Sequence, residues 1–269
     1  EETYSHLVLL CENMTGWRNL MTLSSLSFTE GFYGKPRVDT ELLRKHHEGL
    51  IALSACLSGE IPRRLCAGDY SGAVEAARQM ADIFGPDHFC IEIQNHRLPE
   101  EKQILPQLVR LARELELPLV ATNDCHYLRR EDAGMQEILT CIATNRTLQD
   151  GGRIGFATDE FYYKTTAEMQ ALFSAFPEAL ENTVKIAARC SVELDFSHTY
   201  LPRFPCPDGQ SAGEYLRSLT YAGFARRVAA GEIRFTGRHP EEEYRTRLEY
   251  ELSVIGNMGY DDYYLIVWD

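Results

Sequence analysis

The sequence predicts an α/β fold, in which short apolar strands alternate with amphipathic helices. Four strand-sized apolar runs are separated by helical stretches within the first 145 residues, a pattern typical of parallel strands joined by helical crossovers. The 269 residues are 44% hydrophobic and 25% charged, enough for one large domain or two small ones. No apolar run reaches the roughly 18 to 20 residues that a bilayer demands, so we expect no membrane partner.

The first 145 residues contain all four predicted strands, at 6–11, 50–55, 88–93 and 117–122. The first strand is compact and apolar, which indicates a buried position. Capping residues, glycines and prolines mark the helices that separate the strands. Counting the capping residue, these helices begin at Asn13, Asp39, Gly59, Ser71, Pro99 and Glu131.

The remainder of the chain reads as helical, after a predicted turn at 150–153. Thr166 and Pro177 begin two helices, which end at Phe173 and Cys190. Prolines in 200–209 indicate an extended linker. Two longer helices follow at 211–230 and 240–258, and an apolar segment at 260–268 begins a further element.

The net charge and the cysteine spacing indicate how the chain could contact nucleic acid and in which redox environment it folds. The chain has 27 basic and 40 acidic residues, a net charge of -13, with the acidic excess spread over both halves. Contact with nucleic acid would therefore need positive charge from a metal site or a neighbouring domain. The eight cysteines include no CxxC pair, which predicts reduced, cytosolic thiols. Because the chain lacks an initial Met and stops abruptly, we expect it to be a piece of a longer protein.

Polar residues gather where the predicted strands end, the edge at which α/β folds bind ligands. Asp124 and His126 follow the fourth strand two residues apart, so their side chains converge in an extended segment and suit Zn, Mn or Fe. Cys56 follows the second strand, where it is either a buried thiol or a soft metal ligand. His96 follows the third strand, where it is either a ligand at the rim of the site or a polar loop residue without a ligand role. His6 lies at the amino end of the first strand, which is the wrong end for such a site in a parallel sheet.

Simpler interpretations exist for each of these residues. Asp124 can cap the next helix with His126 bonded to it, and lone cysteines are more often buried hydrophobes than ligands. The sequence contains no P-loop, GxGxxG, GxSxG or HExxH motif, and no D-x-D pair for two-metal nucleotidyl transfer.

Four segments resemble the PHP domain (polymerase and histidinol phosphatase) of bacterial DNA polymerase III alpha subunits: residues 4–10, 16–21, 48–60 and 118–127, the last reading PLVATNDCHY. The similarity continues through 161–164, 177–183, 200–205 and 258–269, so it covers essentially the whole chain. It implies a PHP domain at 1–200, lacking its N-terminal part, as a piece of a distorted (β/α)7 barrel. Residues 201–269 would be the linker and the helical start of the palm region.

The resemblance also implies a metal site. The positions that match the family's ligands are His6, Cys56, Asp124 and His126, with Asp124 and His126 also carrying the chemistry, whereas His96 matches no firm ligand. The remaining family ligands, an HxH motif, an Asp, a later His and a Glu, would lie upstream of Glu1. The palm aspartates, which use Mg, would lie downstream, so this piece alone would not polymerise DNA.

Three functions follow as expectations. The first is a piece of a cytoplasmic replicative polymerase that acts on primer-template DNA and dNTPs beside a sliding clamp and other replicase subunits, with a metal-dependent 3′–5′ exonuclease in its PHP barrel. The second is an inert, metal-stabilised scaffold that docks the polymerase core and a proofreading subunit. The third is a free-standing phosphoesterase, which the similarity through residue 269 disfavours.

Overall fold

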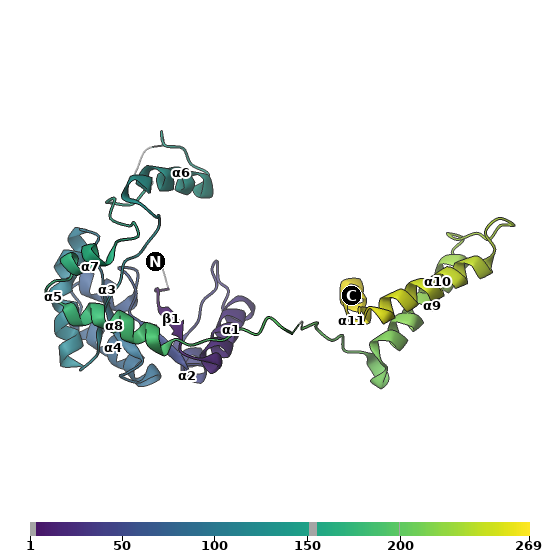
Figure 1. The fold of residues 1–269 in the computed structure, drawn as a ribbon, viewed down its shortest axis with the longest axis horizontal. Coiled ribbons are helices and arrows are strands. Elements are labelled where there is room, and N and C mark those ends of the chain that lie inside the picture. Colours follow the sequence, from purple (N-terminus) through teal and green to yellow (C-terminus); the bar gives the residue numbers. More distant parts are fainter. Residues whose placement is uncertain (1–3, 151–154, 199) are drawn as a thin grey trace. The chain divides into compact units, whose positions relative to one another are not determined.

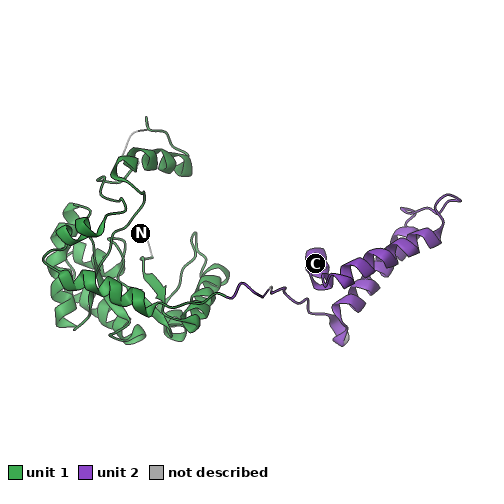
Figure 2. Ribbon diagram, in the orientation of Figure 1, with its two compact units in different colours: residues 1–194 green, residues 195–269 purple. Residues whose placement is uncertain are grey.

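A computed structural model describes residues 4–150, 155–198 and 200–269. The predicted turn at 150–153 therefore lies mostly outside the described residues. The chain divides into two compact units, Glu1–Leu194 and Asp195–Asp269, which Figure 2 colours separately. The first unit contains every described strand, and the second is helical.

One four-stranded sheet, in the order β1-β2-β3-β4, organises the first unit. Its strands are β1 (Val8–Cys11), β2 (Leu50–Leu53), β3 (Phe89–Ile93) and β4 (Leu119–Ala121). The β2–β3 and β3–β4 pairs are parallel, as the sequence predicts. The β1–β2 pair is antiparallel, with Val8 opposite Leu53 and Cys11 opposite Leu50, so the prediction of a parallel sheet is wrong for β1.

The antiparallel strand β1 is less buried than the three parallel strands. Strand β1 is an edge strand, and its four residues are only partly buried, whereas every residue of β2, β3 and β4 is buried. The prediction of a buried first strand is therefore wrong. Parallel strands need crossover helices that cover both faces of a sheet, and a lone antiparallel edge strand does not.

The helices of the first unit follow the predicted order (Figure 1). They are α1 (Met14–Thr29), α2 (Thr40–Lys45), α3 (Glu60–Cys66), α4 (Tyr70–Phe84), α5 (Pro99–Glu114), the 3₁₀ turn η1 (Arg130–Asp132), α6 (Ala133–Thr144), α7 (Thr166–Leu172) and α8 (Pro177–Arg189). Asp39 accepts a backbone N–H bond as the predicted cap of α2, and Asn13, where the first helix was predicted to begin, caps α1. Two predicted caps are displaced: Asp69, not Ser71, caps α4, and Thr165, not Thr166, caps α7.

Alternating strand residues pack on the two faces of the sheet. Leu50, Ala52, Phe89 and Ile91 join the main core with α3, α4 and α5. Their neighbours form a smaller cluster with Ile186 of α8 on the other face: Ile51, Leu53, Cys90 and Val120. Since successive strand side chains point to opposite faces, both faces of the parallel strands must be apolar, and the sequence of β2 (LIAL) meets that need.

The second unit comprises the 3₁₀ turn η2 (Pro207–Gly209), α9 (Ala212–Ala229), α10 (Glu241–Asn257) and α11 (Asp261–Trp268). Ser211 and Glu214 form a capping box at the start of α9. Helices α9 and α10 are joined by Arg217 and Glu249, whose Nη1 and Oε1 atoms lie 2.5 Å apart, and Leu265 of α11 is fully buried. Among the described residues, no helix has the length and apolar character to cross a membrane.

Candidate metal centre

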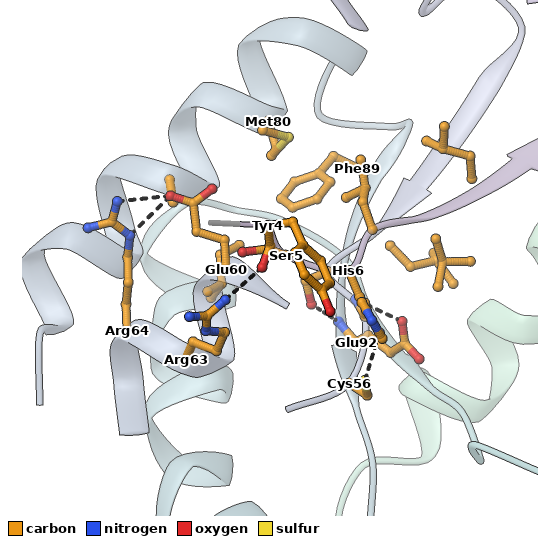
Figure 3. Close-up of a pocket in the computed structure, with 18 of the residues that line it drawn as sticks. Tyr4, Ser5, His6, Cys56, Glu60, Arg63, Arg64, Met80, Phe89 and Glu92 are labelled. Carbon is orange, nitrogen blue, oxygen red and sulfur yellow. Dashed lines mark hydrogen bonds and ion pairs between the residues drawn. The ribbon is translucent and has the colours of Figure 1, made fainter. Parts of the chain in front are cut away.

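The antiparallel direction of β1 brings His6 to the carboxyl ends of the other strands. The His6 N–H donates to the Ser58 carbonyl at 3.0 Å, and His6 forms a parallel bridge with Gly59. Its Nδ1 atom lies 3.7 Å from the Cys56 Sγ atom (Figure 3). The position of His6 before its strand is therefore compatible with a site at this edge, because the strand runs against its neighbours.

The loop after β2 holds Cys56 in a constrained backbone. Ala55 has φ of +64°, a left-handed conformation that costs a non-glycine residue about 1–2 kcal/mol. The Gly59 N–H donates to the Cys56 carbonyl at 2.8 Å, and a Cβ atom at Gly59 would lie 2.2 Å from the Ser54 carbonyl oxygen. Only glycine fits at that close approach, so the loop presents Cys56 in one geometry.

Asp124 and His126 lie beside each other after β4. The Asp124 Oδ1 and His126 Nε2 atoms are 3.3 Å apart, and the backbone N–H of His126 donates to the Phe161 carbonyl at 2.8 Å. The contact of His126 with Asp124 agrees with both the metal-ligand and the simpler interpretation. The next helical element, η1, is preceded by Arg129, whose N–H donates to Asp132, so Asp124 does not cap it.

A cavity of about 1350 Å³ is lined by three of the four predicted ligands. His6, Cys56 and Asp124 are all among its lining residues, whereas His126 is not. Within the described residues no three His, Cys, Asp or Glu side chains converge closely enough to hold a metal, so the four predicted ligands form two pairs. Nitrogen, sulfur and carboxylate donors suit Zn, Mn or Fe, and the donor chemistry of these residues therefore fits a transition metal.

His96 occupies a different environment from the other predicted residues. Its side chain is 1% exposed, and its ring stacks on Phe161 with centroids 4.2 Å apart. The Nε2 atom accepts the Asp124 N–H at 3.2 Å, which places the ring proton on Nδ1, 2.6 Å from Glu101 Oε1. Both ring nitrogens thus have protein partners, and His96 contacts the site through the backbone of Asp124.

Glu92 of β3 is a site residue that the sequence reasoning missed. Its side chain is 4% exposed and lines the same cavity as Cys56 and Asp124. Desolvation by burial raises the pKa of its carboxyl group, and the nearby Asp124 charge raises that pKa further. The available signal was an acidic residue inside the apolar run FCIEI, since a charged side chain is rarely placed in a buried strand without a specific role.

Comparison with known proteins shows which families the chain resembles. The PHP domain family model matches residues 1–96, and the family model described as "Bacterial DNA polymerase III alpha NTPase domain" matches residues 214–269. The DNA polymerase III subunit alpha of Treponema pallidum is 46% identical over 99% of this chain.

The chain is homologous to a segment of the bacterial DNA polymerase III alpha subunit. Other alpha subunits agree: that of Borreliella burgdorferi is 41% identical over 98% of the chain, and that of Thermus aquaticus is 40% identical over 99%. The chain spans only 22% of the length of the first two relatives and 26% of the third. The predicted resemblance to this polymerase family is confirmed.

Proposed function

We propose that this chain is a segment of a cytoplasmic bacterial replicative DNA polymerase, with a PHP domain at 1–200 and the linker and helical start of the palm region at 201–269. The parent protein would copy primer-template DNA from dNTPs with Mg at its palm site, together with a sliding clamp and other replicase subunits. The homology to alpha subunits over almost the whole chain supports this proposal. A (β/α)7 barrel would extend the four described strands with strands from the rest of the parent chain.

The PHP domain would act as a metal-binding module, and the observation that carries this is the meeting of His6, Cys56 and Asp124 in one cavity. His6 and Cys56 would bind through nitrogen and sulfur, and Asp124 and His126 through oxygen and nitrogen. Divalent Zn, Mn or Fe bound there would activate water and neutralise charge on a phosphodiester, which is the chemistry of a 3′–5′ exonuclease. Asp124 and His126 would be the catalytic residues of that activity, with Asp124 exposed to the cavity in which a phosphodiester would bind.

A scaffold is the second candidate function, and two observations favour it. The predicted ligands form two pairs instead of one cluster within the described residues. Helix α6 also exposes four apolar side chains at helical spacing, a surface suited to docking a protein: Met135, Ile138, Leu139 and Ile142. In this function the metal would stabilise a platform for the polymerase core and a proofreading subunit.

Metal analysis of the full-length gene product tests the metal module. We expect elemental mass spectrometry of the purified wild-type protein to show stoichiometric Zn, Mn or Fe, which the Asp124→Ala, His126→Ala double variant loses. The matched control is Asp195→Ala, His198→Ala, because Asp195 Oδ2 and His198 Nδ1 form an exposed pair 2.5 Å apart in the second unit. The control should keep its metal, and a wild-type protein without metal would reject the module.

An exonuclease assay then separates the two candidate functions. A metal-loaded protein that shortens 5′-labelled single-stranded DNA from its 3′ end, and loses this activity with Asp124→Asn while staying folded, supports the exonuclease. A metal-loaded protein without nuclease activity, whose melting temperature falls when the metal is removed, supports the scaffold.

A further inference from the structure

Glu92 joins the two loops that carry the proposed metal ligands. Its Oε2 atom accepts the Ala55 N–H at 3.0 Å, one residue before Cys56. Its Oε1 atom accepts the Thr122 hydroxyl, two residues before Asp124, and the Gln94 amide at 2.9 Å. One buried carboxylate thus bonds the end of β2 on one side and the end of β4 on the other.

The backbone of Glu92 reinforces the same connection. The Glu92 N–H donates to the Ser54 Oγ atom at 2.8 Å, and the Ser54 N–H donates to the Cys90 carbonyl at 3.1 Å. Both residues before Cys56 are therefore held by β3. On the other side, the Thr122 N–H donates to the Ile93 carbonyl at 3.1 Å.

The cost of this arrangement indicates a purpose beyond folding. Glu92 lies on the same face of β3 as Cys90, next to the small apolar cluster, where an isolated carboxylate is expensive to bury. Its partner Ala55 has the left-handed backbone described above. An apolar residue at position 92 would avoid this desolvation cost but would leave the buried Ala55 N–H without its acceptor, so the strained Ala55 backbone depends on Glu92. Strain of this kind concentrates at functional sites.

We propose that Glu92 is a positioning residue of the metal site, which fixes the Cys56 loop and the Asp124 segment at one separation. The inference rests on the proposed metal function, since it concerns the residues that orient its ligands. In this role Glu92 acts through its hydrogen bonds with Ala55 on one side and with Thr122 and Gln94 on the other, and not as a ligand. Such supporting hydrogen bonds typically change metal affinity by 10- to 100-fold.

Cobalt binding to the metal-free, full-length gene product tests the inference without an activity assay. Co²⁺ is the probe because its thiolate charge-transfer absorption reports Cys56 as a ligand. Glu92→Met keeps the length of the side chain and removes both acceptors. We expect it to bind Co²⁺ 10- to 100-fold more weakly and to lose most of the thiolate band, with a lower melting temperature than the wild type because the buried Ala55 N–H loses its acceptor.

Glu92→Gln is the conservative variant that separates positioning from ligation. Its amide oxygen can still accept the Ala55 N–H, while its amide nitrogen donates to the Thr122 hydroxyl oxygen. We therefore expect Co²⁺ affinity within about threefold of the wild type and a restored thiolate band. If Glu92→Gln binds as weakly as Glu92→Met, the carboxylate acts as a ligand and the positioning role is wrong.

Glu12→Met is the matched control at the opposite edge of the sheet. The Glu12 carboxylate also bridges two elements, through Arg189 Nε at 2.8 Å and His88 Nε2 at 3.1 Å, but it touches neither ligand loop. Its Co²⁺ affinity should change by less than twofold. If Glu92→Met does not fold, Thr122→Val removes only the hydrogen bond between Glu92 and the segment that carries Asp124. This variant should weaken Co²⁺ binding while keeping the thiolate band.

The outcomes distinguish failure of the inference from failure of the proposed function. Wild-type protein that binds no Co²⁺ rejects the metal module, and the inference with it. Wild-type protein that binds Co²⁺ with a thiolate band, together with Glu92→Met or Thr122→Val protein of unchanged affinity, overturns only the role of Glu92.

Discussion

Replacing His96 with leucine removes two hydrogen bonds that the imidazole ring makes inside the first unit. The Nδ1–H bond to the buried Glu101 carboxylate, 2.6 Å long, involves a charged acceptor and contributes about 2 kcal/mol. The bond from the Asp124 N–H to Nε2, 3.2 Å long, joins neutral groups and contributes about 1 kcal/mol. His96→Leu should therefore lower the free energy of unfolding by about 3 kcal/mol.

Two isosteric variants divide this effect between the bonds. The amide of Asn overlaps Nδ1, so His96→Asn keeps a donor for Glu101 and should lose about 1 kcal/mol. The amide of Gln reaches the position of Nε2, so His96→Gln keeps an acceptor for the Asp124 N–H and should lose about 2 kcal/mol. Urea unfolding in a Trp268→Phe background, followed by Trp17 fluorescence, measures the first unit because Trp17 lies in α1.

Hydrogen exchange at the Asp124 amide should follow a different order from stability. His96→Gln should keep this amide protected although it is the less stable of the two isosteric variants, and His96→Asn should expose it. The reasoning is refuted if amide protection and stability fall together, or if His96→Asn is less stable than His96→Gln.

Two further predictions concern acid stability and the Cys56 loop. Hydrogen bonds from the Tyr162 hydroxyl and, to a smaller extent, from the Thr165 N–H lower the pKa of Glu168 from 4.5 to about 2. The ionised Glu168 carboxylate therefore contributes stability above pH 4.5, and this contribution is lost as the pH falls towards 2. The difference in unfolding free energy between wild type and Glu168→Gln should shrink over that pH range, and a constant difference would contradict the assignment. Gly59→Ala should destabilise the protein by about 1–3 kcal/mol, because its Cβ atom would overlap the Ser54 carbonyl oxygen. Gly134→Ala in α6, where nothing lies within 4 Å of the new Cβ atom, should be neutral or slightly stabilising in the same urea titration.

Local patterns predicted most elements of this fold because each depends on short-range chemistry. Apolar runs located the strands, and the cap at Asp39 was predicted from residue type alone. The direction of β1 was not available in the same way, since strand pairing is decided by contacts between residues far apart in the sequence, such as Val8 and Leu53, which are 45 positions apart. A four-residue apolar run has no feature that tells parallel from antiparallel pairing.

The site shows the same division. Asp124 and His126 share a segment, so their proximity follows from a two-residue spacing, and the structure places them 3.3 Å apart. The pairing of His6 with Cys56, 50 residues away, had to come from resemblance to a family. Glu92 was overlooked because its role depends on donors at positions 55 and 122, which sequence spacing cannot bring together.

The reversal of β1 also explains why the two edges of the sheet carry different chemistry. Residues from His6 to Glu12 span about 20 Å in extended conformation, so a parallel β1 would carry Glu12, instead of His6, to the carboxyl edge. In the observed direction Glu12 lies at the amino edge, where it binds His88, which immediately precedes β3, and Arg189 at the end of α8. At the amino ends of the strands, the Glu12 carboxylate is held by an ion pair with Arg189 and a contact with His88, whereas at the carboxyl ends His6, Cys56 and Asp124 face a cavity. Because β1 is antiparallel, the carboxylate at the amino ends of the strands serves stability, and the donors at the carboxyl ends are open to a ligand.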